Sequence, residues 1–315
     1  MTKRITGLVG GVSAVLLAGA CESEEAFGVA DDVAMRELVD NGMRLNGMRL
    51  NGMRLNGMRL NGMRLNGDDG TADYVEIKKT NVANASKVLA SHLIGSQLFI
   101  DTKKDGTFSG LGLVDTVFQL DLKGDGRGNH KKDLKITGFG LLAPGSDVAV
   151  YNLEVKDGGW QPLCEDGSEA ILLADVWNPE TGDRLDPVSD TLTFACRGAA
   201  LAKCVEFGYR PWASASGVSL RDHHQACTRM VRADYCGDGV THTTNGTPIH
   251  VLDELGVQTV EIGLNYVVEA EWGPDGATCL NGSNTRHADQ IIECDIPACG
   301  SSFASGGLIQ SGKVL

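Results

Sequence analysis

The chain has 315 residues with a formal net charge of −13, and 42% of its residues are apolar while only 5% are aromatic. This length is enough for one large globular domain or two small ones after any tails are removed. The acidic balance argues against a nucleic-acid partner, because phosphate binding needs a basic face. With 41 glycines and 8 prolines, the composition favours a turn-rich β protein over a helical bundle.

The N-terminus has the pattern of an export signal. Two basic residues precede an apolar stretch, residues 7–20, that is too short for a membrane-spanning anchor. It ends in Leu-Ala-Gly-Ala-Cys21, which resembles a bacterial lipobox, although Ala18 stands where a branched apolar residue is usual. We therefore predict a signal peptide over residues 1–20 and lipidation of Cys21, which would anchor the protein to a membrane. An ordinary secretory signal cleaved after Ala20 is the alternative.

The segment after Cys21 is acidic. Its first residue is Glu22 rather than the Asp that commonly keeps lipoproteins at the inner membrane, so we expect the outer membrane of a Gram-negative bacterium. Residues 21–40 hold seven acidic residues and one arginine, a composition typical of a solvated spacer without a core. We predict that they form an acidic tether.

A basic repeat follows over residues 41–67. The unit Asn-Gly-Met-Arg-Leu occurs five times without change. A period of five gives no continuous apolar face on a helix or on a strand, and Asn-Gly is a strong turn signal. We predict a mobile spacer. The alternatives are a short solenoid resembling pentapeptide-repeat β-helices and a ligand segment that a partner recognises.

The globular body is predicted over residues 72–315. Its first part contains short apolar or alternating runs that Gly, Asp and Pro clusters separate. Such spacing predicts a sheet that is sandwich-like or barrel-like. The predicted strands include residues 75–77, 97–100, 117–122, 134–136, 148–153 and 170–173.

The later part of the body is rich in cysteine. An even number of cysteines in an exported chain predicts four disulfides, and the paired C-x-x-C knuckles of a zinc site are absent. Sequence leaves the connectivity open. The eight cysteines are Cys164, Cys196, Cys204, Cys227, Cys236, Cys279, Cys294 and Cys299.

Two helices are predicted among these cysteines, over residues 198–207 and 220–234, the second with Ser219 or Asp222 as its N-cap. Together with the strands they predict an α+β fold. We expect a β-rich, sandwich-like N-terminal sheet followed by a disulfide-stapled, helical and cysteine-rich portion.

Several motifs surround these helices. They are Thr-Phe-Ala-Cys at 193–196, Gly-Tyr-Arg-Pro-Trp at 208–212, Glu-Ala-Glu-Trp-Gly-Pro at 269–274, and a run at 224–239 that contains Ala-Asp-Tyr-Cys. In these motifs the chain resembles the bacterial ADYC-domain proteins, over roughly residues 74–282. The resemblance implies an exported lipoprotein, and it carries no known activity.

No metal or cofactor is predicted. The turn 121–129 resembles a calcium loop, but Lys132 occupies the place of the bidentate Glu, so a hairpin turn is preferred. His224, His242 and His250 have no spacing typical of metal ligands.

The candidate catalytic residues are His223, His224 and Asp234. A dyad of His224 with Cys227 would need a free thiolate, which an oxidised cysteine does not supply, and no G-x-S-x-G serine elbow is present. We therefore expect a membrane-tethered binding or structural lipoprotein at the cell surface, with an unknown protein or glycan as its partner. The alternative is an exported hydrolase, such as a peptidase, that uses His224 and Asp234.

Overall fold

The structure is a computed structural model, and the described residues are 43–44, 74–81, 88–123, 130–164, 167–178, 181–185, 191–243, 248–259, 265–286 and 291–314. The chain divides into two units, 1–37 and 38–315, and all described residues belong to the second. The predicted signal peptide, Cys21 and the acidic tether therefore lie outside the described residues.

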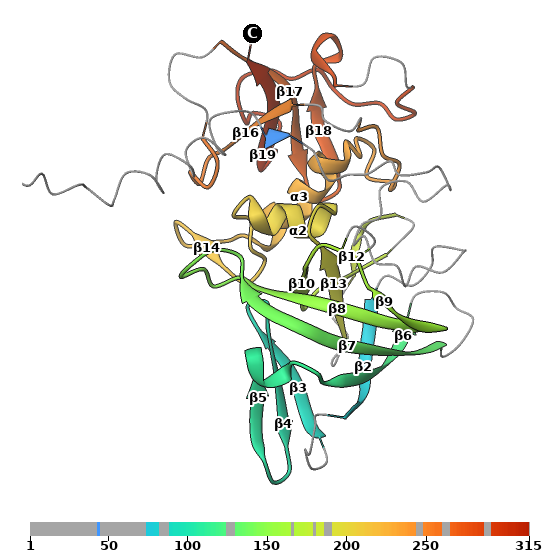
Figure 1. Ribbon diagram of the computed structural model, residues 1–315. Helices are drawn as coiled ribbons and strands as arrows, with labels where there is room; N and C mark the ends of the chain where they lie inside the picture. Colours follow the sequence, from blue (N-terminus) through green and yellow to red (C-terminus); the bar gives the residue numbers. More distant parts are fainter. Residues whose placement is uncertain are drawn as a thin grey trace, which may run out of the picture. The chain divides into compact units, whose positions relative to one another are not determined.

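The larger sheet has seven strands in the order β10-β13-β2-β6-β7-β8-β9, and all its pairs are antiparallel (Figure 1). A further pairing of β10 with β8, at Ala170 and Tyr151, closes the sheet on itself. The strands are β2 (Tyr74–Asn81), β6 (Val117–Lys123), β7 (His130–Leu141), β8 (Ala149–Asp157), β9 (Gly159–Pro162), β10 (Ala170–Leu173) and β13 (Thr191–Cys196).

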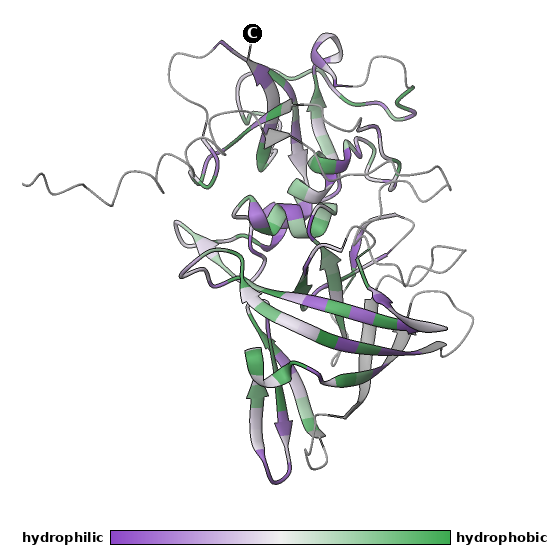
Figure 2. Ribbon diagram, viewed as in Figure 1, coloured by the Kyte–Doolittle hydropathy of each residue, from purple (hydrophilic) through white to green (hydrophobic). Residues whose placement is uncertain are grey.

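Alternation of side chains explains how this sheet packs. Along β7 and β8, apolar and polar residues alternate (Figure 2). Side chains such as Ile136, Leu153 and Val155 enter one core cluster, whereas intervening residues such as Asn152 and Lys156 are exposed. Strand β10 is buried throughout because both of its faces are covered. Leu172 belongs to the first cluster, whereas Ile171 belongs to a second one that includes residues of helix α2 (Ala200–Glu206).

A three-stranded sheet packs against the first cluster. It consists of β3 (Val88–Ile94), β4 (Gln97–Thr102) and β5 (Gly106–Ser109), followed by the short helix η1 (Gly110–Leu113). Leu98 and Ile100 on β4 point into the cluster, and the Leu98 N–H donates to the Tyr151 hydroxyl over 2.9 Å. Two small hairpins complete this region: β11 (Val176–Trp177) with β12 (Arg184–Leu185), and β14 (Ser214–Ala215) with β15 (Val218–Ser219).

The last part of the chain forms a five-stranded antiparallel sheet in the order β1-β16-β19-β17-β18. Its strands are β1 (Met43–Arg44), β16 (Pro248–Asp253), β17 (Tyr266–Gly273), β18 (Gly276–Leu280) and β19 (Ile309–Val314), and the short helix η2 (Gly282–Asn284) follows β18. Strand β1 comes from the pentapeptide repeat, and the rest of the repeat lies outside the described residues.

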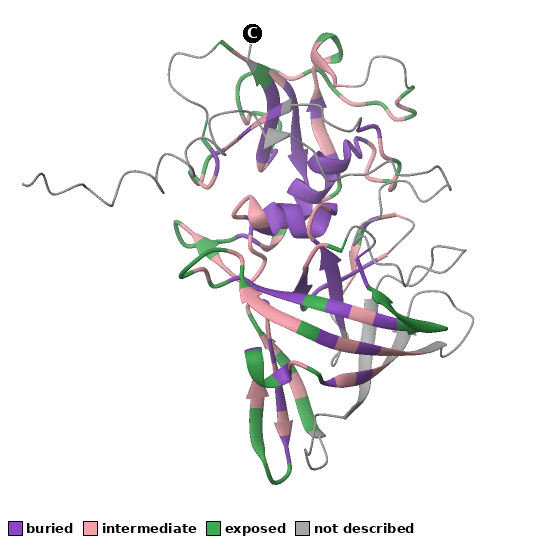
Figure 3. Ribbon diagram, viewed as in Figure 1, coloured by how far each residue is buried: buried purple, intermediate pink, exposed green. Residues whose placement is uncertain are grey.

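Two α-helices are described, α2 and α3 (Arg221–Arg232), and both are mostly buried (Figure 3). They contact each other, and α3 also contacts β17, β18 and β19. No helix within the described residues is both long and apolar enough to cross a membrane.

The predicted α+β fold with a helical, cysteine-rich portion is wrong. The structure is mostly β-strand with two short helices, and the cysteine-rich part is largely a sheet with long loops. The larger sheet also closes on itself rather than forming one layer of a sandwich. Sequence patterns missed the second sheet because β17 carries two buried glutamates, Glu269 and Glu271, where a half-buried strand would have apolar residues.

Disulfide bonding was predicted and is confirmed. All eight cysteines after Cys21 are paired, as Cys164–Cys196, Cys204–Cys227, Cys236–Cys294 and Cys279–Cys299. The second pair joins α2 to α3. The last two pairs hold the segment 291–300, in which no helix or strand is described. Covalent bonds therefore fix a segment that has little backbone pairing of its own.

Candidate functional site

Helix α3 carries most of the longest motif and is almost fully buried. Every residue from His223 to Arg232 is buried. The helix ends because Ala233 adopts a left-handed conformation, with φ 51°, and its N–H bonds back to carbonyls of the last turn. This turn directs the following residues, Asp234 to Cys236, away from the helix axis.

A buried ion pair links the end of α3 to Asp234. Arg229 Nη1 lies 2.6 Å from Asp234 Oδ2, and the two side chains are 1% and 0% exposed. Arg232 also faces this carboxylate, at 3.9 Å, and the backbone N–H of Gly239 donates to both of its oxygens. Burial raises the pKa of Asp234 above its usual value, although both arginines and these hydrogen bonds oppose that shift.

Arg229 also binds two loops that come from other parts of the chain. It donates to the carbonyl oxygens of Thr181 and Pro274 and to the carboxylate of Asp183. Gly182 fits this crowded place because its φ is +70° and because a Cβ there would lie 2.5 Å from a nitrogen of Arg232. The arginine and the aspartate thus connect helix, turn and hairpin in a single polar cluster.

A second buried cluster surrounds Glu269. Arg286 binds its carboxylate through Nε and Nη2, and Tyr235 and Ser311 donate hydroxyl hydrogen bonds to it over 2.6 and 2.8 Å. Burial opposes ionisation, but the charge and hydrogen bonds of Arg286 outweigh it and lower the pKa of Glu269 to about 2. The register of β17 on β19 shifts between Val268 and Ala270, so Glu269 occupies a β-bulge.

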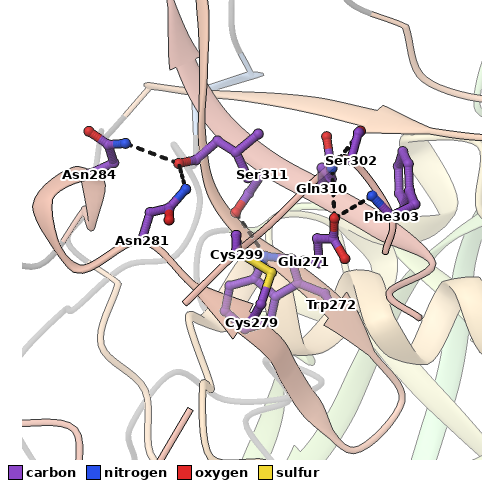
Figure 4. Close-up of a disulfide and its surroundings, with 11 residues drawn as sticks. Glu271, Trp272, Cys279, Asn281, Asn284, Cys299, Ser302, Phe303, Gln310 and Ser311 are labelled. Carbon is purple, nitrogen blue, oxygen red and sulfur yellow. Dashed lines mark hydrogen bonds between the residues drawn. A yellow bond between two sulfur atoms is a disulfide. The ribbon is translucent and has the colours of Figure 1, made fainter. Parts of the chain in front are cut away.

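The next glutamate organises the loop near the last disulfide (Figure 4). Glu271 is 1% exposed and accepts hydrogen bonds from the Phe303 N–H and from Gln310 Nε2. Gln310 also donates to the hydroxyl of Ser302 over 2.8 Å. These bonds and the neighbouring Cys279–Cys299 disulfide fix the loop against the sheet.

The histidines of the motif are packed inside the protein. His224 is 0% exposed, its Nε2 lies 3.0 Å from the Leu201 carbonyl, and its ring packs near Trp177. Burial lowers the pKa of His224 to about 4. His223 is also buried and stacks with Tyr209, and burial lowers its pKa as well. His242 is buried too, with Nδ1 3.0 Å from the Ala233 carbonyl.

The three candidate catalytic residues are not assembled as a reactive group. The hydrogen bond of His224 goes to α2, whereas Asp234 is held by Arg229 and Gly239. Cys227 is in a disulfide, so no thiolate is available there. His224, Cys227 and Asp234 are all 0% exposed, and His223 is 5% exposed.

The structure offers no metal centre within the part that it describes, where no three His, Cys, Asp or Glu side chains are grouped to hold an ion. His250 lies on β16. The hydrogen bonds of His224 and His242 go to the carbonyls of Leu201 and Ala233 and do not involve it. Most of the calcium-like turn, residues 124–129, lies outside the described residues.

Sequence reasoning missed an exposed aromatic residue, Trp160, on the edge strand β9. Trp160 is 38% exposed. Lys135 Nζ lies 4.7 Å from the centre of a Trp160 ring and Lys156 Nζ lies 5.9 Å from it, as cation–π contacts. Lys135 also pairs with Glu154 over 2.6 Å. The available signal was the alternation of β8, which sends Glu154 and Lys156 outward.

Sequence reasoning also missed the buried partners of the motif, Glu269 and Arg286. Two glutamates two residues apart within an otherwise apolar run, at 269 and 271, were the available signal, because buried acids need basic or hydroxyl partners. The sequence does not indicate that Arg286, seventeen residues away, is the partner of Glu269.

A comparison with family models found that the ADYC domain matches residues 110–286, which is more than half of the chain. The match begins at η1, includes both helices, the Asp234 cluster and the Glu269 cluster apart from Ser311, and ends at Arg286. It confirms the ADYC domain, with a match that begins at residue 110 rather than near 74 and ends at 286 rather than near 282. The comparison with curated proteins found no match, and neither did the comparison with solved structures.

The Asp234 cluster gives a stability prediction. Changing Asp234 to Asn removes the negative charge and leaves Arg229 and Arg232 buried without it, so the free energy of unfolding should fall by about 3–5 kcal/mol in urea denaturation. Asp183→Asn is the matched control, because Asp183 binds the same arginine but is 52% exposed. It should cost less than about 1 kcal/mol. Equal losses in the two variants would contradict the structural role of Asp234.

The buried imidazole of His224 gives a pH prediction. Its pKa is about 4 in the folded protein and about 6.5 in the unfolded chain, so between these values only the unfolded state takes up its proton. The free energy of unfolding should therefore fall as the pH drops from about 6.5 to 4, by up to about 3 kcal/mol. In His224→Gln this part of the pH dependence should be absent. His223 remains in that variant and acts in the same direction. A loss of stability that is the same in both proteins would contradict the prediction.

Proposed function

We propose, on the premise that the chain belongs to the ADYC-domain family, that it is a membrane-tethered, disulfide-stabilised binding module and not an enzyme. The observation that carries this proposal is the use of the motif residues. His224, Cys227 and Asp234 are buried and bonded to the protein itself, so they stabilise the fold and cannot reach a substrate.

The tether is the N-terminal part of the proposal. The lipobox-like end at Cys21 supports lipidation, and the acidic residues after it support a spacer. Four disulfides are compatible with an oxidising compartment outside the cytoplasm. Together these features favour an outer-membrane lipoprotein whose body faces away from the lipid.

The ligand surface that we propose is the outward face of β7, β8 and β9 around Trp160. Edge strand β9 is exposed at all four of its residues. The ammonium groups of Lys135 and Lys156 lie over the indole ring, and the carboxylate of Glu154 pairs with Lys135. The surface thus combines a flat apolar ring with two ammonium groups over it and a carboxylate that pairs with one of them.

A glycan fits this surface better than a protein does. Protein hot spots place aromatic residues in desolvated surroundings, whereas the neighbours of Trp160 are charged. A sugar ring has a face of C–H groups that can lie on an indole once the flexible lysine side chains move off the ring, and it has hydroxyl groups that can then pair with Lys135, Lys156 and Glu154. We therefore propose a polysaccharide ligand.

Binding to insoluble glycans tests this surface. The protein should sediment with at least one polysaccharide of a panel that includes purified peptidoglycan, and Trp160→Ala should weaken that binding about tenfold, which corresponds to about 1.4 kcal/mol. Leu111→Ala is the matched control, because Leu111 is an exposed apolar residue (73%) on η1. Its binding should be unchanged. Binding that survives in Trp160→Ala would exclude this surface, and sedimentation with no member of the panel would argue against a glycan.

Anchoring is tested separately with Cys21→Ala. Without the thiol no lipid can be attached, so the protein should move from the membrane fraction to the soluble exported fraction, and incorporation of labelled fatty acid should stop. The binding of the purified body to glycan should not change in this variant. Unaltered membrane fractionation of Cys21→Ala would show that something other than a lipid holds the protein.

A further inference from the structure

The exposed surface around Trp160 carries local positive charge in an acidic protein. Lys135 lies opposite Glu154 across β7 and β8, and Lys156 lies opposite Trp160 across β8 and β9. Residues 154 and 156 are two positions apart on β8 and therefore share one face of the sheet. At this surface the ammonium groups of Lys135 and Lys156 accompany the single carboxylate of Glu154, whereas the whole chain has a formal net charge of −13.

The two lysines differ in how their charge is compensated. Lys135 Nζ lies 2.6 Å from a carboxylate oxygen of Glu154, and both side chains are partly buried. Lys156 is exposed, and among the residues that the structure describes no carboxylate pairs with its ammonium group. Its contact is with the Trp160 ring, 5.9 Å from the ring centre. Lys156 therefore carries the uncompensated positive charge of this surface.

Moving Lys156 off the indole costs little free energy. A cation–π contact at an exposed site stabilises by only about 0.5–1 kcal/mol, and its four-carbon side chain is flexible. When a sugar covers the ring, the ammonium group loses this contact and part of its hydration, so it needs a new partner. A carboxylate on the sugar is a better partner than a hydroxyl, because hydrogen bonds between charged groups are about twice as strong as neutral ones.

We propose that the ligand of this surface is an anionic polysaccharide, whose carboxylates pair with Lys156 while a sugar face lies on Trp160. The proposal rests on the proposed glycan-binding function and names the class of glycan. The acidic remainder of the protein does not prevent such binding, because exposed charges more than about 8 Å apart are largely screened at physiological ionic strength, whereas a pair in contact is screened less.

Polymers that differ only in charge test the proposal. The probes are immobilised polygalacturonate, alginate and purified peptidoglycan, each compared with the same polymer after methyl esterification of its carboxylates, together with neutral dextran. The full chain should bind at least one acidic polymer about tenfold more tightly than its ester, a difference of about 1.4 kcal/mol. Raising the NaCl concentration from about 0.05 to 0.5 M should weaken this binding, because salt screens an exposed ion pair.

Variants of Lys156 assign the charge that is recognised. Lys156→Gln should weaken binding to the acidic polymer about tenfold and leave binding to the ester unchanged, whereas Lys156→Arg should keep both. Lys103→Gln is the matched control. It removes the same unit of charge from an exposed lysine on the turn between β4 and β5, in another sheet, so its binding to every polymer should be unchanged.

Glu154→Gln tests the sign of the charge effect. Glutamine keeps the capacity for hydrogen bonds but leaves Lys135 without a carboxylate, so a second ammonium group becomes available to the ligand. Affinity for the acidic polymer should rise about threefold, in line with the strength of an exposed ion pair, and affinity for the ester should not change. Weaker binding of the acidic polymer to Glu154→Gln would contradict the proposal.

The outcomes separate this proposal from the glycan-binding function. Binding that depends on Trp160 but is equal for an acidic polymer and its ester, or that persists in Lys156→Gln, would overturn the proposal and leave glycan binding intact. An equal loss in Lys103→Gln would also overturn it, because net charge and not this surface would then attract the polymer. Failure to bind any of the polymers would count against glycan binding itself, and the proposal would fall with it.

Discussion

The buried ion pair of Arg229 and Asp234 is the interaction on which the arrangement around α3 depends. Two charges that lose their hydration must be compensated by hydrogen bonds, or they destabilise the fold. Here Arg229 reaches Asp234 and the loops at Thr181 and Pro274, and Asp234 also binds the backbone of Gly239. Helix α3, the β11–β12 hairpin and the turn between β17 and β18 are therefore fixed together. Moving one of them would leave a buried charge without a partner.

The same need for compensation explains what the sequence could and could not predict. Strands β6, β8 and β10 and both helices were found because apolar periodicity marks them. The C-terminal sheet was missed because Glu269 and Glu271 face the interior of β17, and periodicity treats an acid as exposed. The even number of cysteines predicted the disulfides, but which cysteines pair depends on the positions of the strands and helices in the folded protein. For the site, the motif located the important residues and not their role, since burial of His224 and Asp234 is a property of the tertiary structure.

The motif residues His224, Cys227 and Asp234 stabilise the fold from its interior. The clusters around Asp234 and Glu269 bury the polar groups that a hydrolase would need to expose. Trp160, on the outward side of the closed sheet, stays exposed. Substitutions on this exposed face are therefore expected to leave the buried clusters intact.

The coupling between Arg229 and Asp234 tests this account most directly. A double-mutant cycle compares the free energies of unfolding of Arg229→Met, Asp234→Asn and the double variant with that of the original protein. We expect each single variant to be strongly destabilised and the second change then to cost much less, with a coupling energy of about 2 kcal/mol or more. Additive losses, with a coupling energy near zero, would contradict the claim that this pair holds the surrounding elements together.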